Sequence, residues 1–186
     1  LHRIPEIGFQ LRDTQAYVLR ELKQCGPDRI ETPAVCGVKA VFFAKDAETT
    51  IAFRADMDGI HNDEANDVPY CSQRPGNMHG CGHDLHMTGL LGAAFWLAEH
   101  RDKFAGSIKI LFQPSEETGQ GARAMIDAGL VDDVEAIIGT HNNPNYAPGQ
   151  LAIGVEPMMA GCVKFRVTLH AQGTHAGYPY KGTGPI

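Results

Sequence analysis

Residues 78 to 86 read MHGCGHDLH, which places three histidines, one cysteine and one aspartate within nine positions, directly before an Ala- and Leu-rich stretch. Imidazole and thiolate are the ligands that zinc and neighbouring transition metals prefer. Cys81 and His83 lie two residues apart on a glycine-containing loop, so both can face one ion. No second cysteine lies near Cys81 at the spacing of a closed structural zinc site. The stretch therefore indicates an open, catalytic metal site that precedes a helix.

Helix-like and strand-like patterns alternate on both sides of this stretch. Apolar spacing predicts helices over 10–24, 87–100 and 121–128. Runs of β-branched, aromatic or continuous apolar residues predict strands over 38–44, 50–55, 107–112 and 135–140. We expect the strands at 38–44 and 50–55 to be neighbours, joined by the charged turn KDAET. Helices between strands are typical of an α/β fold with a mostly parallel sheet flanked by helices.

Acidic and imidazole side chains follow three of the predicted strands. Asp56 and Asp58 leave the second strand, Glu116 and Glu117 follow the third, and His141 follows the fourth. The carboxyl ends of parallel strands share one edge of the sheet, where ligands bind. Two adjacent carboxylates repel each other unless a cation or a shared proton lies between them. We therefore expect one glutamate to bind metal and the other to transfer protons, although both aspartates fit a simple turn equally well.

Composition excludes several classes of function. The chain has 186 residues and a net charge of −6 without a run of lysine or arginine, which argues against nucleic-acid and anionic-membrane partners. No apolar stretch approaches the ~18 residues of a membrane span, and no signal peptide opens the chain. Five scattered cysteines suit a reducing cytoplasm. Because the first residue is Leu1 and the last lies just after a Gly and Pro cluster, we expect a fragment of a longer protein.

Five ordered segments carry a resemblance to a known family. They are HRIPEIGF at 2–9, FRADMDG at 53–59, MHGCGHDLHMTGLLGAA at 78–94, QPSEETGQGARAMIDAGL at 113–130 and THAGYP at 174–179. The chain resembles the N-acyl-amino-acid amidohydrolases of the two-metal metallopeptidase superfamily. This group includes aminoacylases, hippurate hydrolase and the hydrolases of indole-acetyl amino acids. The resemblance implies hydrolysis of the amide bond of a small N-acyl or N-aroyl amino acid.

The resemblance also implies a fold and a set of site residues. It implies a zinc-exopeptidase-like catalytic domain and a smaller α+β lid domain that forms a homodimer. Two divalent ions are expected, zinc or manganese with cobalt or nickel as alternatives, and their ligands would be Cys81, His83, Glu117 and His141. Glu116 would be the general base and acid, Asp58 would orient a ligand, and His175 would stabilise the oxyanion in the partner subunit's site. A final metal-binding histidine is expected beyond residue 186.

The residues from 162 to 171 predict the start of that lid. Val163, Phe165, Val167 and Leu169 alternate with polar residues, a pattern typical of a half-buried antiparallel strand. We therefore divide the chain into residues 1–160, the N-terminal part of the catalytic domain, and residues 161–186, the beginning of the lid. The segment 157–161 is a candidate hinge.

Departures from the family pattern leave the substrate open. His61 stands where relatives usually have a proline, residues 141–144 read HNNP without the tryptophan usual there, and Tyr180 replaces a histidine. His79 and His86 lie off the ligand pattern, and we expect them to support ligands rather than bind metal. Two alternatives to amidohydrolysis remain. One is a dipeptidase or carboxypeptidase that uses the same site, and the other is a metal-binding or dimerisation module without turnover.

Overall fold

A computed structural model describes residues 1–33, 36–44, 49–155, 157–161, 163 and 165–183. The chain divides into two compact units, Leu1–Pro144 and Asn145–Ile186. The first unit holds the sheet and the helices around it. In the second unit the described residues include one short 3-10 helix, η1 Pro179–Lys181. The predicted division into a catalytic domain and a lid at residue 160 stays a prediction.

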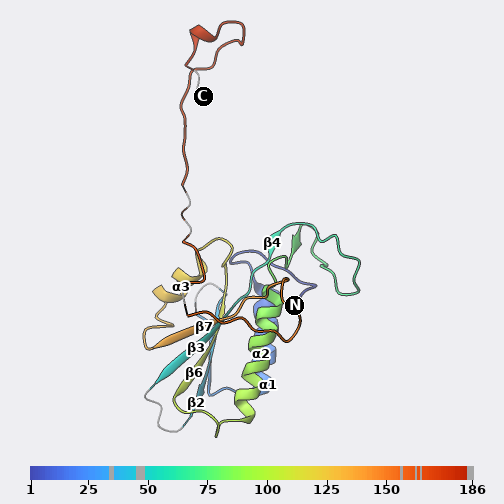
Figure 1. The fold of residues 1–186 in the computed structure, drawn as a ribbon, viewed down its shortest axis with the longest axis vertical. Helices are drawn as coiled ribbons and strands as arrows, with labels where there is room; N and C mark the ends of the chain where they lie inside the picture. Colours follow the sequence, from blue (N-terminus) through green and yellow to red (C-terminus); the bar gives the residue numbers. More distant parts are fainter. Residues whose placement is uncertain (34–35, 45–48, 156, 162, 164, 184–186) are drawn as a thin grey trace. The chain divides into compact units, whose positions relative to one another are not determined.

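The described residues of the first unit form a five-stranded sheet and three helices (Figure 1). In chain order its elements are α1 Arg12–Cys25, β1 Arg29–Glu31, β2 Val38–Phe43, β3 Thr50–Asp56, β4 Ile60–His61, β5 Asn77–Met78, α2 His83–Glu99, β6 Ser107–Gln113, α3 Gly121–Asp127 and β7 Ala136–Gly139. β4 and β5 form a separate two-stranded pair. Apart from α2, which begins earlier, the helices and the four strands predicted in this unit lie within two residues of the expected bounds.

The sheet order is β1-β2-β6-β3-β7. β3, β6 and β7 are parallel, and β2 is antiparallel to both β6 and β1. Four of the five strands therefore run in one direction, with β2 alone reversed, which confirms the mostly parallel α/β sheet. The carboxyl ends of β3, β6 and β7 lie at one edge, so the loops that follow these strands can form one site.

The expected pairing of β2 with β3 is wrong, because β6 lies between them. Phe112 of β6 pairs with Val38 on one side and with Ala55 on the other. β6 is buried at every residue except Ile108, which is partly buried, as expected for a strand with neighbours on both sides. The short connection between β2 and β3 does not reveal this, and residues 45–48 lie outside the described residues. The pattern of a short strand predicts its burial but not its partner.

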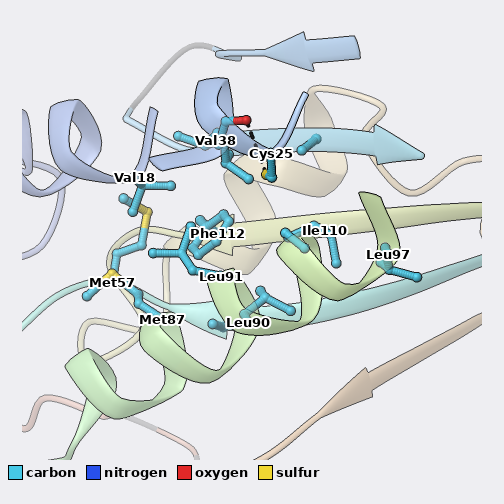
Figure 2. Close-up of a cluster of buried hydrophobic side chains, with 14 of the residues drawn as sticks. Val18, Cys25, Val38, Met57, Met87, Leu90, Leu91, Leu97, Ile110 and Phe112 are labelled. Atoms are coloured by element: carbon cyan, nitrogen blue, oxygen red, sulfur yellow. Dashed lines mark hydrogen bonds between the residues drawn. The ribbon is translucent and has the colours of Figure 1, made fainter. Parts of the chain in front are cut away.

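Helices cover both faces of the sheet. α1 and α2 lie together on one face, and α3 lies on the other (Figure 1). The larger core lies beneath α1 and α2 and is drawn in Figure 2. Alternate residues of β6 serve the two layers, since Ile110 and Phe112 face the larger core while Leu111 packs with Met125 of α3.

Helix α2 begins at His83, four residues before its predicted start at Met87. Gly82 precedes it with a positive φ of 84°, which favours glycine, and a Cβ there would lie 2.3 Å from Asn142 Oδ1 and would displace that side chain. The apolar pattern begins later because the first turn carries His83 and His86. Three residues apart, these two side chains project from the same side of the helix.

The described part of segment 162–171 forms no strand, so that prediction is wrong for these residues. Val163, Phe165, Val167 and Leu169 are exposed, while residues 162 and 164 lie outside the described residues. Alternation alone does not make a strand, because the backbone groups need a partner strand and the apolar face needs a covering layer.

None of the described helices has the length and the apolar character of a membrane span.

The position of Phe112 predicts a large effect on stability. Its side chain is fully buried at the centre of the sheet, so Phe112→Ala should lower the free energy of unfolding by about 3–5 kcal/mol. Phe43, at the exposed end of β2, is the matched control, and Phe43→Ala should cost under about 1 kcal/mol. Urea unfolding followed by circular dichroism measures both values. Equal losses would contradict the proposed centre of the core.

Candidate metal centre

The buried imidazole of His83 lies where the loops after β3 and β6 meet the start of α2. Its Nε2 is 3.7 Å from Asp56 Oδ2. The same atom is 3.8 Å from Glu116 Oε2 and 3.7 Å from Glu117 Oε1. Three carboxylates around one buried ring repel each other unless positive charge lies among them. The centre of the site therefore requires a proton or a cation.

The orientation of His83 suits a metal ligand. Its Nδ1 donates a hydrogen bond to the backbone carbonyl of Asp58 at 2.7 Å, which turns Nε2 toward the carboxylates. This Nε2 is buried and has no hydrogen-bond partner among the described residues. Burial opposes the charged form, but the hydrogen bond to Asp58 and the charge of Asp56 outweigh it and raise the pKa of His83. Without a metal ion, a proton fits the position that a cation would take.

Cys81 and His141 complete a group of donors around His83. The Cys81 Sγ lies 3.4 Å from His141 Nε2, and His141 Nδ1 donates to the carbonyl of Asn142 at 2.7 Å. One donor atom from each of Cys81, His83 and His141 lies within 4.8 Å of the others. Burial, followed by the charge of Glu117, raises the pKa of Cys81 to about 11. The thiol is therefore protonated in the absence of a cation, and metal binding would release its proton.

Asp58 holds the loop that carries the two glutamates. Its carboxylate is almost completely buried and accepts the backbone N–H of Glu116 at 2.9 Å and that of Glu117 at 3.3 Å. Gly121 allows the chain to turn back after this loop, because a Cβ there would lie 1.5 Å from the carbonyl oxygen of Pro114. Together with its carbonyl bond to His83, Asp58 fixes one predicted ligand and the backbone of two further site residues.

A second polar network lies behind His83. Asp56 accepts from Arg54 Nη1 at 2.7 Å and from His86 Nδ1 at 2.5 Å. Burial alone would raise the pKa of Asp56, but the His86 bond and the Arg54 charge lower it to about 2. The sequence did not predict Arg54 or Asn142, which contacts His86. For Arg54 a signal existed, since residues two apart on a strand share a face.

His79 and His2 lie beside the site but not among the donors. Neither ring nitrogen of buried His79 has a partner in the described part of the chain, and burial lowers its pKa to about 4. His2 bridges two acids, with Nδ1 2.8 Å from Asp84 Oδ2 and Nε2 3.0 Å from Glu64 Oε1. His2 thereby links the N-terminal segment to the first turn of α2, and the supporting role expected of His79 stays a prediction.

The structure brings together six of the seven predicted site residues. They are Asp58, Cys81, His83, Glu116, Glu117 and His141. The seventh, His175, lies in the second unit, where its Nδ1 accepts the backbone N–H of Gly177 at 3.0 Å. The role of His175 stays a prediction. The donors gathered in the first unit are thiol, imidazole and carboxylate, which fit a transition-metal ion.

Comparison with known proteins identifies the family. Residues 52–183 match the model of peptidase family M20/M25/M40. The chain belongs to this family. It is 40% identical over 186 residues to the N-acetyl-L-cysteine deacetylase of Bacillus subtilis, a match that covers 100% of this chain and 45% of that relative. It is 34% identical over 192 residues to thermostable carboxypeptidase 2 of Saccharolobus solfataricus, covering 100% of this chain and 48% of the relative.

A solved structure of the M20 family has the same fold. It is the Bacillus subtilis YXEP protein, described as a dinuclear metal-binding peptidase, with a TM-score of 0.75 and 35% identity over 78% of this chain and 41% of that one. The chain thus spans less than half the length of each of these M20 relatives. The resemblance seen in the sequence motifs is confirmed at the level of the family.

The thiol of Cys81 gives a direct test of metal binding by this M20 chain. Cys81→Ala removes the soft donor and should weaken binding of cobalt(II) by at least about tenfold, with loss of the thiolate-to-cobalt absorption. Cys71→Ala is the matched control, because Cys71 is a partly buried free cysteine outside the donor groups. Titration of metal-free protein, followed by absorbance, measures both. Unchanged absorption in Cys81→Ala would exclude this cysteine as a ligand.

The bridge made by His2 predicts a pH-dependent stability. Burial disfavours the charged ring, but hydrogen bonds with Glu64 and Asp84 prevail and raise the pKa of His2 above its usual value. Its stabilising contribution should therefore be complete below about pH 6.5 and disappear as the pH rises through the raised pKa. His2→Gln should cost more stability in mild acid than in mild alkali.

Denaturant unfolding at several pH values measures this difference. His100→Gln is the control, since the hydrogen bond described for the His100 side chain is to the carbonyl of Trp96, four residues before it, and involves no acidic residue. A cost of His2→Gln that is the same at all pH values would show that its charge contributes nothing.

Proposed function

We propose that this chain forms the metal-binding part of an enzyme that hydrolyses the amide bond of N-acyl or N-aroyl amino acids. One observation carries the proposal, namely the unpartnered Nε2 of buried His83 among thiol, imidazole and carboxylate donors. The membership of the M20 family supports a hydrolase, and the deacetylase among the relatives supports an N-acyl amino acid as the substrate.

We propose two divalent ions. The described donors form overlapping groups that share His83, which groups with Cys81 and His141, with the two glutamates, and with Asp56 and His86. The free nitrogen of His83 can bind one ion, so the second ion would use the remaining donors, and the dinuclear metal site named for the YXEP protein supports two ions. The charge of Glu117 raises the pKa of the Cys81 thiol more than the charge of Glu116 does. This stronger interaction with a proposed ligand supports Glu117, rather than Glu116, as the acidic ligand. When bound, the ions would polarise the amide carbonyl and lower the pKa of the attacking water. We propose zinc or manganese, with cobalt or nickel as substitutes that the donor set also accepts.

The remaining acidic residue has the properties of a general base. The side chain of Glu116 is partly exposed, with a relative accessibility of 39%, so its carboxylate can reach a water molecule. Its backbone is held by Asp58 at 2.9 Å, which limits the positions of the side chain. Glu116 would take the proton of the attacking water and give it to the departing amine. Asp58 would act by orientation, since it contacts the backbone of the loop and His83.

Two further proposals concern the assembly and the location. His175 would reach the site of the partner subunit in a homodimer and stabilise the oxyanion. Among the described cysteines Cys25, Cys36, Cys71 and Cys81 are free, which suits the cytoplasm.

Carboxypeptidase activity is a second candidate, and the identity to thermostable carboxypeptidase 2 favours it. Both activities would use the same donors and the same base, and they differ in the group on the carbonyl side of the cleaved bond, a simple acyl or aroyl group in one case and an amino acid or peptide in the other. A panel of N-acetyl amino acids, N-benzoyl amino acids and dipeptides, incubated with the natural full-length protein and manganese or zinc, separates them. Release of amino acid from the acyl substrates and not from dipeptides supports amidohydrolysis. No release from any substrate by metal-loaded protein would exclude both activities.

Substitution of Glu116 tests the proposed base. Glu116→Gln keeps the shape of the side chain but cannot accept the proton, so kcat should fall by about 10²–10⁴-fold. The amount of metal bound should stay unchanged, because Glu116 is not a proposed ligand. Glu99→Gln, at the exposed end of α2, is the control and should leave kcat unchanged. A Glu116→Gln enzyme of normal activity would remove Glu116 from this role.

A further inference from the structure

His86 uses both of its ring nitrogens to join two separate parts of the first unit. Its Nδ1 lies 2.5 Å from Asp56 Oδ1 at the end of β3. Its Nε2 lies 3.2 Å from the backbone nitrogen of Asn142 and 2.8 Å from Asn142 Oδ1. Without a proton on Nε2 the ring accepts the backbone N–H, and with a proton there it donates to Oδ1, so the partner is Asn142 in either form. The ring is almost completely buried. His86 therefore connects a buried strand end to the loop that follows β7.

Asn142, which bonds His86, also forms a hydrogen bond with His141 and so limits the position of that ring. The carbonyl of Asn142 accepts a hydrogen bond from His141 Nδ1 at 2.7 Å. This bond turns His141 Nε2 toward Cys81, where it lies 3.4 Å from the sulfur. The peptide groups of Asn142 thus have His86 on one side and the imidazole of His141 on the other.

Apart from an edge-to-face contact of the His141 ring with the His86 ring, whose centroids are 4.5 Å apart, the loop after β7 has little packing that could fix His141. β7 is an edge strand, its four residues are exposed, and among the described strands it pairs with β3 alone. His141 and Asn142 are exposed as well. An imidazole on such a loop keeps a defined direction only if hydrogen bonds hold its backbone. The Asn142 side chain lies close to Gly82, where the absence of a Cβ leaves room for it.

The other end of the connection is rigid. Asp56 is buried, and its second oxygen accepts from Arg54. Arg54 Nε in turn donates to Gln113 Oε1 at 2.9 Å, at the end of β6. His86 is therefore bonded to Asp56 of β3 and, through Asp56 and Arg54, linked to β6. It connects these two strands and its own helix α2 to the loop after β7.

We propose that His86 is a positioning residue for His141, which it orients through the backbone of Asn142, so that the affinity of the site for its metal ion depends on His86. This inference rests on the proposed metal site. It assigns His86 no direct bond to the ion, because both ring nitrogens are already engaged. Residues that orient a metal-binding histidine typically change metal affinity by about 10–100-fold.

Two variants of similar polarity separate the two ends of the connection. The amide nitrogen of His86→Asn falls near the position of Nδ1, so it can still donate to Asp56 but is too short to reach Asn142. The amide oxygen of His86→Gln falls near the position of Nε2 and can accept the Asn142 N–H. We expect His86→Asn to bind cobalt(II) about 10–100-fold more weakly and His86→Gln to stay within about threefold of the natural protein.

The natural full-length protein, freed of metal, is titrated with cobalt(II) alone by calorimetry. The number of ions bound at saturation should stay the same in both variants, which separates orientation from ligation. His100→Asn, at the other end of α2, is the control and should leave the affinity unchanged. Thermal unfolding of the metal-free proteins shows whether each variant is folded.

A double substitution tests whether His86 acts through His141. In a His141→Ala background, His86→Asn should have no further effect on cobalt affinity, because the residue that it orients is gone. An equal loss in both backgrounds, a loss of one bound ion, or equal affinities of the Asn and Gln variants would overturn the proposal. Failure of the unsubstituted protein to bind cobalt would instead contradict the proposed function, so the two failures are distinguishable.

Discussion

The constraint on which the site depends is the negative charge around the buried ring of His83. Two unit charges 4 Å apart repel each other by about 4 kcal/mol at an effective dielectric constant of about 20. That cost is comparable with the whole stability of many domains, about 5–15 kcal/mol. Three carboxylates lie within 3.8 Å of Nε2, so the folded chain has to supply positive charge or donors for them. The surrounding polar contacts follow from this requirement.

The chain compensates its buried carboxylates and its partly exposed ones in different ways. Both oxygens of Asp56 accept hydrogen bonds, from Arg54 and His86, and both oxygens of Asp58 accept backbone N–H groups. The two glutamates instead face the Nε2 of His83. The aspartates are therefore satisfied by the fold, and the glutamates are the acids that a ligand or a reaction can use. The carboxylates of the site thus differ in role according to whether side chains or backbone N–H groups of the fold donate hydrogen bonds to them.

Local pattern predicted most elements and the general location of the site. The rule that ligands bind at the carboxyl edge of a parallel sheet is sufficient to predict Asp58, Glu116 and His141 in neighbouring loops. The position of β6 between β2 and β3 could not be predicted, because the partner of a strand depends on long-range packing. The strand predicted around Phe165 is wrong although its alternating pattern is clear. A strand also needs a partner strand, which the pattern does not reveal, and Phe165 is exposed. Asn142 has no signal in one sequence, as its contribution comes mainly from its peptide groups.

The two predicted metal-binding histidines are held by different parts of the fold. His83 lies in the first turn of a helix that packs on the sheet, and a buried carbonyl fixes its ring. His141 follows an exposed edge strand, and hydrogen bonds through Asn142 and His86 take the place of packing. A loop held by polar contacts is more sensitive to the loss of one partner than a buried helix, because few other interactions resist its movement. The order of strands, which places β7 at the edge, is thus the structural reason for the positioning role that we propose for His86.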